Sequence, residues 1–321
     1  CVTQDVTTHK ITQASQQQGA NQDWPSFGRD YANQRFSSNA QINRENVKDL
    51  GVAWQYKSGV KAAFQATPIV VDGVMYVSLP FNHVVALNAK TGQELWRYQH
   101  QRRQDWPMCC GPANRGVAVG YGKVFIGTVD ARLIALDAKT GQKLWDINAV
   151  ESAVVTEGQE SLNQNDPNSK AKTTGGTGVG MAMAPVVYKG KVIIGITGVG
   201  YGLHIDNPRE DAPLGAVIGV TGRYGRPGFL AAFDVNTGKR VWQFDTIPTQ
   251  GWEGQFKAIT DDGISLNRDV AAEKASLAKF SDSARFGGGS AWSTPAIDPK
   301  LGLLYFGTGN PSPQMNDVSR P

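Results

Sequence analysis

Two adjacent cysteines, Cys109 and Cys110, stand in the stretch MCCGPANRG at residues 108–116, and the chain's only other cysteine is Cys1. A single buried cysteine usually acts as a small apolar side chain. A neighbouring pair has few ordinary uses of that kind. Zinc sites separate their cysteines by spacers and add further cysteine or histidine ligands, so the pair does not fit an ordinary zinc site. It is therefore a candidate for a functional role, and the surrounding sequence must supply the context.

The composition of the chain is that of a globular protein. Apolar residues make up 40% of the chain and charged residues 19%. The length of 321 residues is enough for one large β domain or two ordinary domains. The net charge of +4 is not gathered into a basic block, so nucleic-acid binding is not indicated. No apolar run approaches the ~20 residues that cross a membrane.

The first residues are polar and show no periodicity. Cys1 is followed by a stretch rich in Gln and Thr, and residues 1–23 are expected to form a flexible tether. One interpretation is a mature lipoprotein with a lipid anchor on Cys1. The other is a boundary of the sequence without functional meaning, and the sequence leaves both open.

A repeat organises the rest of the chain. The pattern A-x-(D/N)-x-x-T-G-x-x-x-W occurs three times, as ALNAKTGQELW, ALDAKTGQKLW and AFDVNTGKRVW, at residues 86–96, 135–145 and 232–242. The first two tryptophans are 49 residues apart, and the third follows after 97 residues, about two such steps. A fixed period in this range is typical of repeat architectures.

Each copy of the pattern lies in the same local context. An apolar strand precedes it, as in GVMYVSL, KVFIGTV and KVIIGIT, and its Thr-Gly turn leads into a strand that ends at the tryptophan. Four short antiparallel strands per unit predict the blades of a β-propeller. We expect the periodic tryptophans to pack one blade against the next. LGVAWQY at 50–56 adds an earlier tryptophan strand, and GLLYFGTG at 302–309 begins a further blade.

These features together resemble the pyrroloquinoline quinone (PQQ)-dependent alcohol dehydrogenases, the methanol and ethanol dehydrogenase family. The resemblance begins at DWPSFGRDYANQRFS (23–37) and is most specific in CCGPANRG, GGGSAW and GTGNP, which occur in the family's order. It implies an all-β, eight-bladed β-propeller with tryptophan docking motifs. About half of that propeller is expected in residues 24–321. The remaining half of the propeller is expected to pack against these residues as a partner.

The resemblance also assigns cofactor contacts. In the family, adjacent cysteines form a disulfide that packs on one face of PQQ, and Cys109 and Cys110 occupy those positions. Such a bond suits an oxidising compartment, and a pair of free thiols is the alternative. Arg115 matches the arginine that pairs with a PQQ carboxylate, a task that suits a planar guanidinium. Trp292 matches the ring stacked on the other face of the cofactor, and the glycines before it permit close backbone approach.

Other positions depart from the family pattern. Gln65 stands where the family usually has a glutamate, so it can form hydrogen bonds but carries no charge. Ala182 stands where a threonine is expected near the cofactor edge. Asn310 matches a metal-ligand asparagine, and its amide oxygen suits Ca²⁺ or a lanthanide. The catalytic aspartate of the family has no counterpart up to Pro321, and Asp317 does not match its context, so no catalytic base is assigned.

The metal-ligand glutamate of the family aligns with Arg223, which cannot ligate a cation. One of three acidic residues in the extra segment 199–219 (Asp206, Glu210 or Asp211) could replace it. Alternatively, Arg223 itself supplies positive charge, or no metal binds. The sequence does not decide among these.

The resemblance implies an enzyme of the periplasm. PQQ would accept electrons from a small-molecule alcohol, and a cytochrome c or a membrane quinone would take them up. A further possibility is a sugar, a polyol or a polymeric alcohol as the substrate, because the enlarged segment 199–219 could reshape the substrate mouth. The rival hypothesis is a non-catalytic β-propeller scaffold of the cell envelope, because propeller lipoproteins share the repeat and because Ala182 and Arg223 depart from the family.

Overall fold

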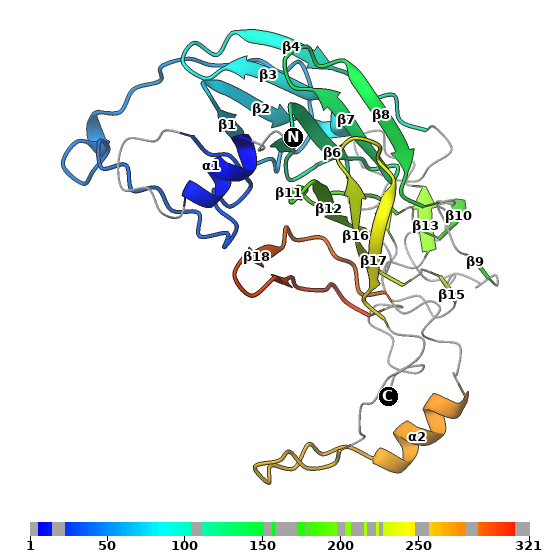
Figure 1. Ribbon diagram of the computed structural model, residues 1–321. Helices are drawn as coiled ribbons and strands as arrows, with labels where there is room; N and C mark the ends of the chain where they lie inside the picture. Colours follow the sequence, from blue (N-terminus) through cyan, green and yellow to red (C-terminus); the bar gives the residue numbers. More distant parts are fainter. Residues whose placement is uncertain are drawn as a thin grey trace.

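Antiparallel sheets in chain order form the body of the computed structural model (Figure 1). The structure describes residues 6–14, 23–103, 111–150, 156–157, 172–176, 179–197, 203–206, 215–216, 223–224, 227–247, 257–279 and 288–311. Three sheets have four strands each. They are β1 (Ile69–Val71), β2 (Val74–Ser78), β3 (Val84–Asn88) and β4 (Glu94–Tyr98); β5 (Ala118–Gly120), β6 (Lys123–Gly127), β7 (Arg132–Asp137) and β8 (Lys143–Asn148); and β11 (Val186–Tyr188), β12 (Lys191–Gly195), β16 (Phe229–Asp234) and β17 (Arg240–Asp245).

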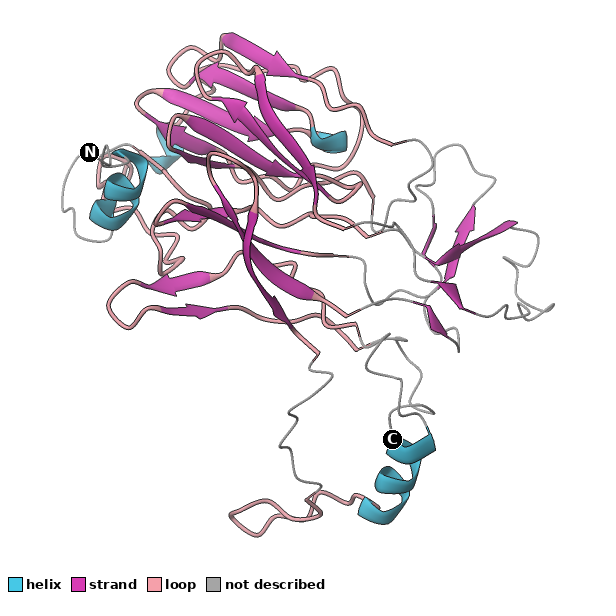
Figure 2. Cartoon of the chain, turned by 45° about the vertical axis from the view of Figure 1, so that its right-hand side comes forward, coloured by secondary structure: helices cyan, strands magenta, loops and turns pink. Residues whose placement is uncertain are grey.

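Smaller elements complete the described part of the chain (Figure 2). A hairpin of β18 (Ala296–Asp298) and β19 (Leu303–Tyr305) follows these three sheets along the chain and forms a two-stranded sheet, which we call the start of the fourth blade. The other strands are β9 (Thr156–Glu157), β10 (Lys172–Gly176), β13 (Leu203–Asp206), β14 (Gly215–Ala216) and β15 (Arg223–Tyr224). The helical segments are α1 (Val6–Ala14), η1 (Val47–Asp49), η2 (Pro80–Asn82) and α2 (Val270–Lys279). Helix α2 lies apart from the sheets in Figures 1 and 2.

The Thr-Gly turns join the third and fourth strands of each full sheet. In the second sheet, Asp137 Oδ1 accepts hydrogen bonds from the backbone N–H groups of Lys139 and Thr140, at 3.0 and 2.8 Å. Gly141 then adopts φ +72°, a conformation that glycine reaches without steric cost. Asn88 and Asp234 repeat this arrangement in the other two sheets. The repeated motif thus encodes a repeated turn.

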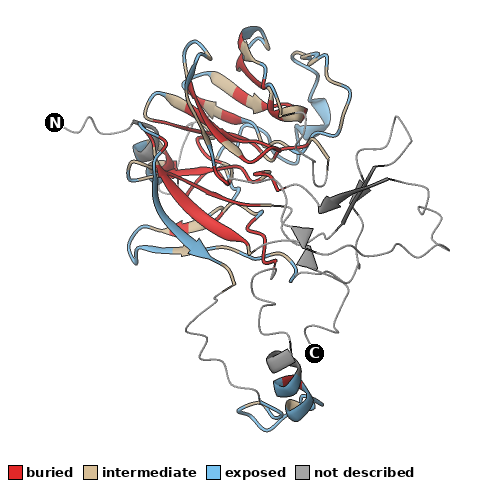
Figure 3. Ribbon diagram, turned by 90° about the vertical axis from the view of Figure 1, so that its right-hand side faces the viewer, coloured by how far each residue is buried: buried red, intermediate tan, exposed pale blue. Residues whose placement is uncertain are grey.

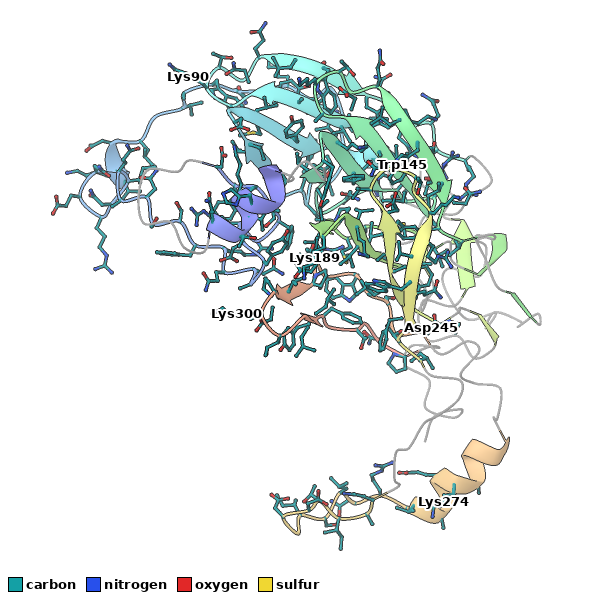
Figure 4. All side chains as sticks on the ribbon, viewed as in Figure 1. Lys90, Trp145, Lys189, Asp245, Lys274 and Lys300 are labelled. Carbon is teal, nitrogen blue, oxygen red and sulfur yellow. The ribbon has the colours of Figure 1, made fainter. Side chains whose placement is uncertain are left out.

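The periodic tryptophans connect successive blades, as predicted. Trp96 of the first blade packs on Gly141 of the second, where an added Cβ would lie 2.5 Å from the indole ring. Its Nε1–H donates to the carbonyl of Ala138, at 3.0 Å. Trp145 of the second blade repeats both contacts, packing on Gly238 in the third blade and donating to the carbonyl of Val235 at 3.2 Å (Figure 4). Each glycine therefore leaves space for the ring of the preceding blade.

The extended residues 50–57 dock on the first blade in the same manner. Trp54 packs on Gly92 and donates to the carbonyl of Ala89, at 3.2 Å. Trp54 therefore makes the contact that the tryptophan on the outermost strand of a preceding blade would make. At the other end of the series, Trp242 is 37% exposed.

Burial falls from the third strand to the outermost strand of each four-stranded sheet (Figure 3). The third strands β3, β7 and β16 each have at least four consecutive buried residues, whereas the outer strands β4 and β8 have at most one. Every residue of β17, the outer strand of the third blade, is exposed. Antiparallel four-stranded sheets, tryptophan docking and this burial together identify the fold as part of a β-propeller.

The segment expected to be a tether contains helix α1. Ile11 is 1% exposed and joins a core cluster that includes Tyr31, Ala118 and Val187. Lys10 pairs with Asp23 at 3.0 Å. Residues 6–14 are therefore a docked helix, and the tether stays a prediction for the rest of residues 1–23.

Candidate functional site

Backbone hydrogen bonds bring together the residues that precede the inner strands. The N–H of Thr67, before β1, donates to the carbonyl of Arg115, at 2.9 Å. The N–H of Arg115, before β5, donates to the carbonyl of Ala182, before β11, at 3.0 Å. We call residues 67, 115 and 182 the backbone arc. It places three successive blades around one point, and Gln65 lies two residues before it, exposed to solvent.

The side chains of Arg115 and Trp292 meet at this point. The guanidinium carbon of Arg115 lies 4.8 Å from the centroid of the Trp292 ring, a cation–π contact. Arg115 is half-buried, while Trp292 is 42% exposed. Two residues predicted as cofactor contacts thus lie side by side, although they precede strands of different blades.

Asn114 fixes the loop that carries Arg115. This residue is 2% exposed, and its Nδ2 donates to the carbonyl of Gly127 at 2.9 Å. Its Oδ1 accepts from the hydroxyl of Ser78 at 3.1 Å and from the N–H of Gly116 at 2.8 Å. A buried amide with partners at both ends holds the backbone in one conformation.

The loop that carries Trp292 is held by two backbone hydrogen bonds. The N–H of Gly289 donates to the carbonyl of Asn310 at 3.0 Å, and the N–H of Gly309 donates to the carbonyl of Ser290 at 2.7 Å. A Cβ placed on Gly309 would lie 3.3 Å from Trp292 Nε1. Asn310, the predicted metal ligand, therefore lies beside the Trp292 loop and is exposed.

The glycines before Trp292 have a packing role inside the protein. A Cβ on Gly228 would lie 2.0 Å from the carbonyl oxygen of Gly289, which is closer than any real contact. Gly289 itself has φ +72°, and its carbonyl accepts from the hydroxyl of Thr246 at 2.6 Å. Close backbone approach is confirmed between these segments. Close approach to a ligand stays a prediction.

A buried charged cluster lies between the first two blades, and no sequence motif pointed to it. Asp130, 0% exposed, accepts from Nε2 of His100 at 2.8 Å and from the hydroxyl of Thr128 at 2.6 Å. The backbone N–H of Arg103 donates to its second oxygen, at 3.0 Å. Burial raises the pKa of Asp130, but the hydrogen bonds from His100, Thr128 and Arg103 outweigh burial and hold it well below its usual range.

Several predicted site residues lie outside the described part of the chain. They are Cys109, Cys110, Glu210 and Asp211. Of Arg223 and Asp206 only the backbone is described, in β15 and β13. Within the described residues, no group of three or more His, Cys, Asp or Glu side chains could hold a metal ion. Asn310 is thus the one predicted metal ligand whose side chain the structure describes.

The described part of the chain contains the α-helices α1 and α2. Neither of the two α-helices found there has the length and apolar character that crossing a bilayer requires.

Comparison with known proteins gives consistent matches over nearly the whole chain. The family model for the β-propeller domain of PQQ glucose/ethanol/alcohol dehydrogenases matches residues 24–321. The chain is 36% identical over 301 residues to the quinohemoprotein alcohol dehydrogenase of Comamonas testosteroni, covering 93% of this chain. It is 32% identical over 296 residues to the lanthanide-dependent methanol dehydrogenase of Methylorubrum extorquens, covering 91% of this chain.

The fold agrees with a solved structure of the same kind. The crystal structure of the Comamonas testosteroni quinohemoprotein alcohol dehydrogenase matches with a TM-score of 0.66 at 32% identity, and the match covers 98% of this chain and 41% of that one. In the sequence comparisons, the chain spans 35% of the Comamonas relative and 41% of the Methylorubrum relative. It therefore corresponds to part of a propeller, and the matched part includes the candidate site.

Proposed function

Because the chain belongs to the PQQ glucose/ethanol/alcohol dehydrogenase β-propeller family, we propose that it is part of an exported quinoprotein that oxidises an alcohol. The catalytic activity, the substrate and the electron acceptor are proposals, since the chain spans about a third of its quinohemoprotein relative. The single observation that carries the proposal is the contact between Arg115 and Trp292.

These two side chains fit a planar cofactor that carries carboxylates. Trp292 is 42% exposed, and its indole is a planar aromatic ring on which a flat conjugated ring can stack. Arg115 places a planar cation 4.8 Å from that ring, and its fork of N–H donors suits a carboxylate. The backbone arc fixes the Arg115 backbone, so both groups are positioned before binding. PQQ, when bound, supplies the quinone that accepts two electrons from the alcohol.

The other predicted contacts extend this site. Gln65 lies next to the backbone arc and donates or accepts hydrogen bonds at the edge of the cofactor. Cys109 and Cys110 form a disulfide that covers the face opposite Trp292. Asn310 offers an amide oxygen to Ca²⁺ or a lanthanide, with further ligands from outside the described residues. One relative is a lanthanide-dependent methanol dehydrogenase, which supports a metal of this class.

The cellular setting is part of the proposal. A disulfide of adjacent cysteines suits the periplasm, where a cytochrome c or a membrane quinone receives the electrons. A lipid on Cys1 would hold the protein at the membrane. No residue is proposed as the catalytic base.

The test is reconstitution of the full-length protein with PQQ. We expect saturable PQQ binding, which is measured by the quenching of tryptophan fluorescence. We also expect the loaded protein to reduce an artificial electron acceptor when methanol, ethanol, glycerol or a sugar is added. Arg115→Gln should abolish tight binding, while Arg132→Gln, which alters an arginine bound to Asp146, should not. A folded protein that binds no PQQ and reduces no dye would instead be a non-catalytic scaffold.

A further inference from the structure

The turns that join neighbouring strands gather at one end of the blades. In each full blade, a backbone hydrogen bond joins the turn between the first two strands to the turn between the last two. These bonds run from the N–H of Ala89 to the carbonyl of Gly73 (2.8 Å), from Ala138 to Gly122 (3.0 Å) and from Val235 to Gly190 (3.1 Å). We call this end of the propeller the turn face. Arg115 precedes the first strand of its blade, so the candidate site lies at the opposite end of the strands.

Exposed lysines stand on the turn face in all four blades. They lie between the strands that the turns join, at Lys90, Lys139, Lys189, Lys239 and Lys300. Figure 4 labels three of them, Lys90, Lys189 and Lys300. None of these lysines forms an ion pair with a residue that the structure describes. Their ammonium groups are therefore open to a ligand from solution.

The aspartates of the turn face are engaged within the chain. Those that open a turn accept backbone N–H groups inside it, and they are Asp137, Asp234 and Asp298. Asp72 forms an ion pair with Lys10 of helix α1. Lys123 and Lys191, at the start of β6 and β12, add two half-buried cations. The lysines outnumber the carboxylates of these turns, so the turn face is positively charged.

Helix α1 docks on the same face. Its Lys10 pairs with Asp72, which lies in the first turn of the first blade, and Ile11 is buried in a core cluster of the blades. Cys1 precedes the first residue of α1 by five positions, and an extended chain of that length spans at most about 18 Å. A lipid on Cys1, as proposed above, would therefore enter a membrane close to the turn face.

We propose that the turn face binds an anionic phospholipid surface, with its lysines on the phosphates of the lipid head groups. Cations spread over the ends of four blades match an extended charged surface, whereas a compact ligand would need them gathered in one groove. Each lysine held near an anionic membrane contributes about fivefold in affinity, and salt screens this contribution. Binding in this way would turn the end that carries Arg115 away from the bilayer. The inference rests on the lysines and does not depend on PQQ binding, and a lipid on Cys1 would add a second attachment.

The experiment measures sedimentation of the full-length protein with lipid vesicles. Cys1→Ser is the reference protein, because it removes the site of a lipid anchor. We expect it to bind vesicles of phosphatidylcholine with about one-third phosphatidylglycerol at low ionic strength, to dissociate as salt is added, and not to bind phosphatidylcholine alone. In this background, Lys90→Gln/Lys139→Gln should weaken vesicle binding by about 10–30-fold. Lys257→Gln/Lys274→Gln makes the same change in charge in the segment that contains α2, away from the sheets, and should bind as the reference does (Figure 4).

A charge-preserving variant and a second ligand separate the outcomes. Lys90→Arg/Lys139→Arg should bind vesicles as the reference does, because the charge is kept. PQQ titration of the same proteins tests the proposed function separately, and the lysine variants should keep the affinity of the reference. Equal vesicle binding by the Gln variant and the reference, or no binding to phosphatidylglycerol vesicles, would overturn the proposal. Lysine-dependent binding to soluble polyglutamate without vesicle binding would overturn it in favour of an acidic protein partner.

Discussion

The guanidinium carbon of Arg115 lies 4.8 Å from the centroid of the Trp292 ring, although the two residues precede inner strands of different blades. The contact depends on the packing of the second, third and fourth blades, because each residue is fixed by the backbone of its own loop. Because separate blades hold the cation and the aromatic ring, the distance between these two groups depends on how those blades pack. The first two predictions therefore separate cofactor binding from blade packing.

Arg115→Lys should weaken PQQ binding by about 10–100-fold in the full-length protein. Lysine keeps the charge but cannot bind a carboxylate through two parallel N–H groups, and a tenfold loss corresponds to about 1.4 kcal/mol. The measurement is a fluorescence titration with PQQ. Arg132→Lys, which changes an arginine bound to Asp146 in the second blade, is the control and should bind as wild type does. Equal affinities for Arg115→Lys and wild type would remove Arg115 from the cofactor site.

Trp292→Ala and Trp145→Ala should have opposite effects. Trp292 is 42% exposed, so its loss should cost PQQ affinity by about 10–100-fold with little change in the Tm. Trp145 docks on Gly238, so its loss should lower stability by about 2–4 kcal/mol and leave the affinity of the folded protein unchanged. Calorimetry and PQQ titration on both variants provide the comparison. A large Tm loss for Trp292→Ala with unchanged affinity would make Trp292 a packing residue.

Gly141→Ala should destabilise the protein more than Gly122→Ala. Both glycines have nearly the same conformation, with φ +72° and +71°. Alanine pays about 1 kcal/mol for that conformation at either position. At Gly141 the new Cβ would also lie 2.5 Å from the Trp96 ring, whereas at Gly122 it meets no atom within 4 Å. We expect a total loss of about 2–4 kcal/mol for Gly141→Ala, measured by denaturant unfolding. Equal losses would show that the docking contact tolerates a methyl group.

Asp130→Asn should reduce stability in a pH-dependent way. Burial raises the pKa of Asp130, but hydrogen bonds from His100, Thr128 and Arg103 hold it below its usual range, so its ionised form stabilises the fold above about pH 4. That contribution is lost as the pH falls. We therefore expect Asp130→Asn to lower the Tm at pH 7, which corresponds to a loss of about 2–4 kcal/mol in the free energy of unfolding. The Tm difference between variant and wild type should be smaller near pH 3.

A second titratable group, His83, lies next to His100, so the experiment with Asp130→Asn needs a control. Burial lowers the pKa of His83, whose ring nitrogen accepts the backbone N–H of His100, and the charges of His100 and Arg97 lower it further, so variant and wild type are compared at each pH. The exposed Asp49→Asn should show no difference from wild type. A Tm difference for Asp130→Asn that persists unchanged at pH 3 would mean that the carboxylate charge contributes nothing.

Cys109 and Cys110 are expected to be bonded to each other. The proposed export would place these adjacent thiols in an oxidising compartment, and Cys1 is the only other cysteine of the sequence. Thiol alkylation of the denatured, unreduced full-length protein should leave both residues unmodified, and labelling after reduction should reach both. Alkylation of both residues before reduction would show free thiols.

The strands and turns were accessible to sequence reasoning because each one is encoded locally. Alternating apolar residues marked β2, β6 and β12, and the Thr-Gly motif marked the turns before β4, β8 and β17. The meeting of Arg115 and Trp292 followed from family resemblance and not from spacing. No sequence motif predicted that Asn114 would hold the loop that carries Arg115.

Other features were not predicted because they depend on contacts distant in sequence. Helix α1 shows no apolar periodicity, and only Ile11 and Ala14 of its described side chains are buried. His100 and Asp130 meet between two blades, and nothing in either local stretch announces the pair. Such features arise from packing, which a single sequence does not display.

The backbone arc has a consequence for how this position can evolve. Arg115 contributes only its N–H and carbonyl to the arc, through Ala182 and Thr67. Every amino acid except proline can form both bonds, so mutation at residue 115 is free to replace the side chain while the blades keep their spacing. Selection can therefore exchange the chemistry at the centre of the propeller without rebuilding the scaffold. Related proteins with different chemistry at this point would retain the arc and differ in the side chain at residue 115.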